Sequence, residues 1–161
     1  MTYAGSLSNL SELSSDSYRF IQGDICDLDL TSKLAESHDA IINFAAESHV
    51  DRSIQSSRDF IMTNILGTQN LLEAAKKKGV KKFVQISTDE VYGSIETVSW
   101  DELFPLKPNS PYAASKAAAE IAFSSYARSF FEQRPMLGAA STRAGNVIGG
   151  GDWLPNRIIP D

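Results

Sequence analysis

Cysteine is almost absent from this chain, and long apolar runs are absent altogether. Cys26 is the only cysteine among 161 residues, so no internal disulfide can form and a reducing compartment is expected. One cysteine and two histidines, His38 and His49, give no metal-ligand spacing. No apolar stretch approaches the ~18 residues of a membrane span, and no secretory signal is visible. We therefore expect a cytoplasmic protein without a metal site or a membrane anchor.

Clustered charge is also scarce. The formal net charge is −5, and the longest run of like charge is Lys76–Lys78. Gly79 follows this run, which is typical of a helix that ends in cations and is capped by glycine. A weakly acidic chain without a basic patch is not expected to bind nucleic acid.

The segments that are present alternate between apolar strands and amphipathic helices. This order predicts an α/β fold with a doubly wound, Rossmann-like parallel sheet and helices on both faces. The nearly continuous apolar run Ala40–Ala46 predicts a central strand. The other expected strands are Arg19–Gln22, Lys82–Ser87 and Leu137–Arg143, and the expected helices are Asp27–Glu36, Arg58–Lys78 and a segment that carries Tyr112 and Lys116. In the long helix, Ile61, Ile65, Leu72 and Ala75 recur at helical spacing and should face the sheet.

A glycine-rich turn is missing where such a fold normally begins. Nucleotide-binding domains of this class open with a strand, a glycine turn and a helix that receives the pyrophosphate. Nothing before Arg19 supplies that unit, and no helix closes the sequence after Ile159. We therefore expect residues 1–161 to be a partial Rossmann-like domain, the middle of a larger protein.

The strongest chemical signal lies just after the Lys82–Ser87 strand. Thr88, Asp89 and Glu90 follow its carboxyl end, where open α/β sheets place their ligands. Tyr112 and Lys116 are four residues apart, so they share one face of a helix. A lysine ammonium beside a tyrosine hydroxyl favours the phenolate and makes it a base near neutral pH. Two adjacent carboxylates with such a tyrosine suit a reaction that moves several protons.

These motifs make the sequence recognisable. It resembles the extended short-chain dehydrogenase/reductase superfamily and, within it, the nucleotide-sugar 4,6-dehydratases. The stretches that carry the resemblance are Tyr3–Gly5, Gly23–Asp27, Asn43–Ser53, Thr63–Thr68, Ser87–Gly93 and Ser110–Lys116. They are most similar to dTDP-glucose 4,6-dehydratases, whereas Thr142–Trp153 looks more like the CDP-glucose enzymes. The nucleotide is left open by this mixture.

The resemblance implies NAD as cofactor, a nucleoside-diphosphate hexose as substrate, and a role for each catalytic residue. Tyr112 is the base at the C4 hydroxyl, and Lys116 is its electrostatic partner. Glu90 is the base at C5, Asp89 is the acid at C6, and Thr88 is a hydrogen-bond partner of the sugar.

The resemblance also implies binding positions outside the catalytic set. Asp24 and Ile25 match the strand end that contacts adenine, and Ala45, Ala46 and Glu47 match the loop beside the cofactor, together with Tyr112 and Lys116. Ser48, His49, Thr88 and Asn146 match positions at the substrate. Gly67 would allow close packing, Trp153 would pack the wall of the site, and Arg52 and Arg143 would be either diphosphate ligands or structural arginines. The family's carboxyl-terminal substrate domain is absent here, and full-length members form homodimers.

Three readings stay open at this point. The first is the core of a 4,6-dehydratase that is inactive as this isolated chain. The second is a 4-epimerase or decarboxylase of the same superfamily, which needs Tyr112 and Lys116 but not the Asp89–Glu90 pair. The third is an inactive remnant or binding module that keeps the fold without turnover.

Overall fold

The computed structural model describes residues 5–95, 99–133 and 137–149, which fall into two compact units. One unit comprises residues 1–23 and 146–161, and its described part holds two short 3₁₀ helices, η1 (Leu7–Leu10) and η2 (Ser15–Ser17). The expected strand Arg19–Gln22 is wrong, because these residues have no regular structure. A strand exists only where its backbone pairs with a neighbour, and apolar side chains alone do not supply one.

The second unit, Asp24–Gly145, is built on a parallel sheet. Its strands β1 (Ala40–Asn43), β2 (Lys82–Thr88) and β3 (Gly138–Ala144) lie in the order β1-β2-β3. Ile42 pairs with Val84, and Thr88 pairs with Ala144. The expectation of parallel pairing is confirmed. The expectation that Ala40–Ala46 is central is wrong for the described residues, since β2 occupies the middle and β1 ends at Asn43.

Helices connect these strands. Before β1 lies α1 (Leu28–Ala35), where the Asp27 side chain caps the amino terminus by accepting from the Leu30 N–H at 3.0 Å. Between β1 and β2 the chain forms α2 (Val50–Gln55), α3 (Arg58–Phe60), the π-helix η3 (Ile61–Gly67) and α4 (Thr68–Lys78). The remaining elements are the 3₁₀ turn η4 (Asp89–Tyr92), α5 (Pro111–Tyr126) and the π-helix η5 (Ala127–Phe131). No described helix is long and apolar enough to cross a membrane.

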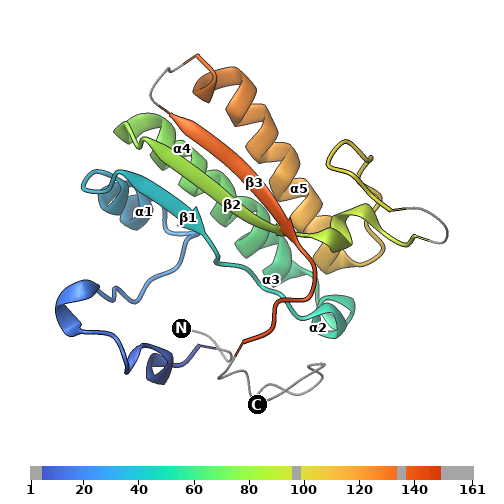
Figure 1. Ribbon diagram of the computed structural model, residues 1–161, viewed down its shortest axis with the longest axis horizontal. Coiled ribbons are helices and arrows are strands. Elements are labelled where there is room, and N and C mark those ends of the chain that lie inside the picture. Colours follow the sequence, from blue (N-terminus) through green and yellow to red (C-terminus); the bar gives the residue numbers. More distant parts are fainter. Residues whose placement is uncertain (1–4, 96–98, 134–136, 150–161) are drawn as a thin grey trace. The chain divides into compact units, whose positions relative to one another are not determined.

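The main helices of this unit cover one face of the sheet. Both crossovers, β1 to β2 and β2 to β3, advance in the same direction, and right-handed crossovers therefore place α4 and α5 on the same side. Figure 1 shows α4 and α5 side by side behind the strands. Asn43 on β1 is 2% exposed, whereas its neighbour Ile42 is 57% exposed. The described residues thus differ from the expected two-sided covering while keeping the expected Rossmann-like fold.

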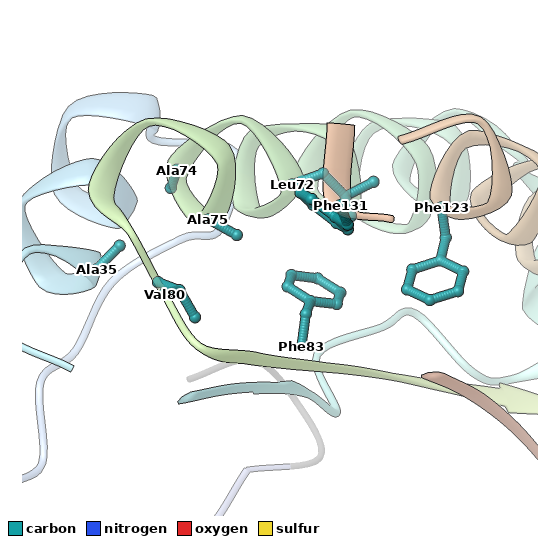
Figure 2. Packing of buried hydrophobic residues seen from close by; sticks show 8 residues of the cluster. All are labelled: Ala35, Leu72, Ala74, Ala75, Val80, Phe83, Phe123 and Phe131. Atoms are coloured by element: carbon teal, nitrogen blue, oxygen red, sulfur yellow. The ribbon is translucent and has the colours of Figure 1, made fainter. Parts of the chain in front are cut away.

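The core lies between β2 and these helices. Phe83 projects from β2 toward the helices, and its ring stacks on Phe123 of α5 at 6.0 Å and lies 6.5 Å from Phe131 (Figure 2). Leu72 of α4 and Val80 complete the same cluster. Burying such side chains contributes roughly 1.5–3 kcal/mol each, so this contact anchors α4 and α5 to the central strand.

The long helix between β1 and β2 has a π-helical section that shifts its faces. Leu72 and Ala75 are buried as expected, but Ile61 is 52% exposed. In the section Ile61–Gly67 the buried residues are Asn64 and Gly67. A π-helix has more residues per turn, so the α-helical period that placed Ile61 inward does not hold there.

Candidate active site

The carboxyl end of β2 turns directly into η4, and Thr88 makes this turn. Thr88 is the amino-terminal cap of η4, where its hydroxyl accepts from the Glu90 N–H at 3.3 Å. The same hydroxyl lies 3.3 Å from the Asp89 carboxylate and donates to it. Asp89 and Glu90 therefore stand at the strand end predicted from the sequence, held by one buried threonine.

The two carboxyl groups differ in their environment. Glu90 is exposed by its surface area, yet partial burial of its carboxyl, followed by the charge of Asp89, raises its pKa above the ordinary value. A like charge next to a partly desolvated acid disfavours ionisation of that acid. Carboxyl groups in distinct environments can take separate acid and base roles.

Helix α5 carries the other two predicted catalytic residues. Ser110 caps it by accepting from the Ala113 N–H at 3.0 Å, and Pro111 occupies its first turn, which fixes where the helix starts. Tyr112 and Lys116 are both buried on the face that packs against β2, η4, α2 and η3. The ring of Phe60 meets that of Tyr112 edge-on, with centroids 6.4 Å apart. The structure thus puts the Tyr112–Lys116 helix against the turn that bears Asp89 and Glu90.

Lys116 is buried with an acceptor within reach. Its Nζ donates to the carbonyl oxygen of Ile86 on β2 at 2.6 Å. Burial lowers the pKa of Lys116, and the negative charge of Glu120, one helical turn away, acts in the opposite direction. A buried ammonium with a depressed pKa is typical of functional sites.

Asn64 is a functional candidate to which the sequence assigned no role. It is buried in η3, and its amide accepts from the Glu47 N–H at 2.8 Å and donates to the Glu47 carbonyl at 2.9 Å. The same amide donates to the Ser115 hydroxyl at 2.8 Å, and that hydroxyl donates to the Tyr112 carbonyl at 2.7 Å. One side chain therefore joins the loop after β1 to the helix of Tyr112. The motif Thr63–Thr68 was the only sequence signal for it.

The loop after β1 holds five of the predicted binding residues. The Asn43 side chain accepts from the Ala45 N–H at 3.1 Å and so fixes the chain as it leaves the strand. Ala46 and Glu47 are half-buried, Ala45 and Ser48 are exposed, and His49 is the amino-terminal cap residue of α2. These residues line the same carboxyl edge of the sheet as Thr88, which is where the family motif predicts them.

Asp24 and Ile25 lie in the segment before α1. The Asp24 carboxylate accepts from the Cys26 N–H at 2.8 Å, and the side chain is exposed. A Cβ on Gly67 would overlap the Ile25 side chain. The expected close packing at Gly67 is confirmed, and it sets Ile25 against the π-helix.

Arg143 is a structural arginine in the described residues. Its guanidinium forms a two-pronged ion pair with Glu120, with Nε–Oε1 at 3.0 Å and Nη2–Oε2 at 2.6 Å. A hollow of about 520 Å³ lies beside it and is also lined by Asp89, Tyr92 and Trp100. The described residues include no cluster of acidic, histidine or cysteine side chains that could hold a metal.

Not every predicted residue joins this site. Asn146 belongs to the other compact unit and is exposed, so its role at the substrate stays a prediction. Trp153 lies outside the described residues. Arg52 is exposed on α2, and its role at a diphosphate likewise stays a prediction.

Fold and site together define a Rossmann-like α/β domain with polar groups gathered at the carboxyl end of its central strand. The family model described as GDP-mannose 4,6 dehydratase matches residues 1–138. The chain belongs to this family. The resemblance to nucleotide-sugar 4,6-dehydratases indicated by the sequence is confirmed.

Named relatives share about half of their length with this chain. The dTDP-glucose 4,6-dehydratase of Streptomyces niveus is 47% identical over 161 residues, which are 99% of this chain and 46% of that protein. The dTDP-D-glucose 4,6-dehydratase of Homo sapiens is 40% identical over 163 residues, which are 99% of this chain and 45% of that protein. The chain therefore spans about half the length of the curated relatives that it matches.

Solved structures agree with the fold. DesIV, a dTDP-glucose 4,6-dehydratase from Streptomyces venezuelae with NAD and DAU bound, matches with a TM-score of 0.91 and 45% identity, over 99% of this chain and 48% of that one. The UDP-Glc/GlcNAc 4-epimerase of Campylobacter jejuni matches with a TM-score of 0.76 and 30% identity, over 86% of this chain and 42% of that one.

Proposed function

We propose that this chain supplies the catalytic core of a nucleotide-sugar 4,6-dehydratase, a lyase that uses NAD to make a 4-keto-6-deoxyhexose. The observation that carries the proposal is the pair Asp89–Glu90 at the end of β2, with the Tyr112–Lys116 helix packed against its turn. A reaction that only oxidises and re-reduces C4 needs one base. Elimination of water across C5 and C6 needs a further base and a further acid, and this site offers both.

In the proposed reaction, Tyr112, Glu90 and Asp89 each transfer one proton. The Tyr112 phenolate takes the proton of the C4 hydroxyl, and Lys116 stabilises that phenolate. The C4 ketone acidifies the C5 hydrogen, which Glu90 removes as a proton. Asp89 gives a proton to the C6 hydroxyl, which leaves as water, so the elimination is balanced in protons. The Glu90 carboxyl, whose pKa is already raised, is suited to hold the C5 proton and return it.

The described residues fit a dinucleotide at this edge of the sheet. Ile25 occupies the space that a Cβ on Gly67 would need, and the neighbouring Asp24 carboxylate is exposed, so it is accessible to the adenosine of a dinucleotide. Asn64 fixes the backbone of Glu47 next to Ala45 and Ala46, which present little side chain. When bound, NAD would accept a hydride from C4 and return it at C6. No Gly-x-x-Gly-x-x-Gly turn lies within residues 1–161.

A chimaera with a solved relative tests the proposal. This chain replaces the matching segment of Streptomyces venezuelae DesIV, and the purified chimaera is mixed with dTDP-glucose and, separately, with CDP-glucose. Mass spectrometry is expected to show loss of one water from the sugar that the chimaera accepts. A folded chimaera that releases no water from either sugar, while DesIV itself is active, contradicts the proposal.

A 4-epimerase is the second candidate, supported by the likeness to the Campylobacter jejuni epimerase. It predicts a product of unchanged mass with the configuration at C4 inverted. The same assay, followed by chromatography of the sugars, separates the two functions. The adjacent carboxylates favour the dehydratase.

The remaining parts of the proposal concern location and assembly. We propose a cytoplasmic enzyme, because a single cysteine suits a reducing compartment. We further propose a homodimer of the full-length protein and no nucleic-acid partner. Light scattering of the chimaera tests the homodimer, and a molar mass equal to one chain contradicts it.

A further inference from the structure

Arg143 on β3 joins three separate segments of this unit. Nη1 donates to the Tyr92 hydroxyl at 2.6 Å and to the Glu102 carbonyl at 3.0 Å. The guanidinium carbon also lies 4.9 Å from the centre of the Tyr92 ring. With the ion pair to Glu120, one side chain contacts η4, the loop after it and α5.

Stability alone does not account for this pair. Glu120 is 3% exposed, so its carboxylate is almost fully withdrawn from water. Desolvating two charges costs several kcal/mol, and apolar residues of similar size often stabilise a fold at least as well. What a planar, two-pronged arginine adds is a fixed geometry between the groups that it contacts.

We call Arg143 with its partners Tyr92 and Glu120 the bridge, and both partners lie on elements of the proposed active site. Tyr92 is the last residue of the turn η4 that begins with Asp89. Glu120 lies one helical turn beyond Lys116 on the buried face of α5. In the sheet, Arg143 is the register partner of Ser87, and the next pair along is Thr88 with Ala144. The bridge therefore spans the two elements that carry the acid and base groups.

We propose that Arg143 and Glu120 are positioning residues, which hold the turn of Asp89 and Glu90 at a fixed place against the helix of Tyr112 and Lys116. The inference rests on the proposed function for what is positioned. The bridge itself can be tested without turnover.

The first test uses this chain and the fluorescence of Trp100. The Trp100 ring stacks on Tyr92 at 5.2 Å, so its emission reports where Tyr92 lies. Trp153→Phe makes Trp100 the only tryptophan. In that background Arg143→Met/Glu120→Met should unfold cooperatively with little change in Tm, and the Trp100 emission should shift to the red. Lys81→Met, which removes the exposed ion pair of Lys81 with Asp39 at 2.7 Å, should leave the emission unchanged. An unshifted emission in the folded double variant overturns the bridge.

The second test uses the DesIV chimaera. Misplacement by about 1 Å can cost ~10²-fold in rate, so the double variant should lose kcat by about that factor with KM changed less than about twofold. Arg143→Lys with Glu120 unchanged keeps the charge but not the two-pronged fork. Its kcat should lie between that of the parent and that of the double variant. If the double variant does not fold, Arg143→Lys alone decides, since a purely structural role predicts a normal kcat for its folded form. A double variant with normal kcat also contradicts positioning. A folded chimaera without turnover contradicts the proposed function. The Trp100 fluorescence test then decides alone whether the bridge exists.

Discussion

The Lys116 ammonium bonds the Ile86 carbonyl oxygen of β2 at 2.6 Å, two residues before Thr88. Lys116 is therefore an anchor of α5 as well as the proposed partner of Tyr112. The same ammonium group thus holds α5 at a fixed distance from the end of β2 and stabilises the Tyr112 phenolate in the proposed reaction.

The raised pKa of Glu90 predicts a stability that falls as pH rises. A carboxyl group whose pKa is higher in the folded state favours folding while it is protonated, and that contribution is lost as pH rises through the folded pKa. Glu90→Gln should therefore raise Tm at pH 7, and the gain should vanish below the ordinary pKa of 4.5. Thermal unfolding between pH 3 and pH 8 measures this.

Glu36 is the matched control, because its hydrogen bond to Lys78 lowers its pKa. Glu36→Gln should not raise Tm at neutral pH. Equal Tm values for Glu90→Gln and the parent chain at pH 7 would contradict the raised pKa.

Glu90 and Tyr112 should fail at different steps in the DesIV chimaera. Tyr112→Phe removes the base at C4, so no ketone forms. Glu90→Gln leaves that step intact and blocks loss of the C5 proton, so a 4-ketohexose that still carries its C6 hydroxyl should accumulate. A positioned base typically raises the rate of its step ~10²–10⁴-fold, so each variant should be slowed at a different step of the reaction. Acid quenching and mass spectrometry identify the sugar; elimination at the parent rate by Glu90→Gln would favour the epimerase.

Gly67 should not tolerate a side chain. A Cβ there overlaps Ile25, so Gly67→Ala should lower the free energy of unfolding by about 1–3 kcal/mol. Ile25→Ala should relieve much of that loss in the double variant. Gly79→Ala is the contrast, because Gly79 has φ +74° with no atom near its Cβ, and Ile25→Ala should give it no relief. Denaturation in urea measures all five variants, the two doubles with Ile25→Ala included. Simple additivity of the Gly67 and Ile25 effects would show that the two residues do not compete for space.

Asn64→Ala should destabilise the chain more than a surface asparagine does. It removes two hydrogen bonds to the half-buried backbone N–H and C=O of Glu47, at about 1–3 kcal/mol for each group. Asn109→Ala, which removes one exposed bond to Ser94 at 2.7 Å, should change stability by less than about 0.5 kcal/mol. Equal effects in urea denaturation would mean that the loop after β1 is held by other contacts.

Local signals were read correctly from the sequence, and distant pairings were not. Gly79 ends α4 in the left-handed conformation, as predicted from its place directly after Lys76–Lys78. The strand end at Thr88 and the spacing of Tyr112 and Lys116 are local in the same sense. Rules of spacing therefore predicted the strand end and the helix on which the proposed catalytic residues lie.

What sequence could not show depends on partners far along the chain. Arg143 meets Glu120 across 23 residues, and Asn64 meets Ser115 across 51. The prediction that Ile61 faces the sheet was wrong because Ile61–Gly67 form a π-helix. The packing around a segment decides whether it becomes π-helical, and the apolar pattern of the sequence does not show this. Arg19–Gln22 has the composition of a strand, but no described strand pairs with it.

The order of the strands has a consequence for how this fold can diverge. The residues with proposed chemistry sit on β2, its turn and α5, while β1 and β3 are the outer strands of the described sheet. Because Arg143 of β3 is ion-paired with Glu120 of α5, we expect sequence after Ala144 to be easier to exchange between homologous genes than β3 itself. A junction after β3 should be tolerated in recombinants. The sequence that follows such a junction can then change while the proposed catalytic residues stay on β2, its turn and α5.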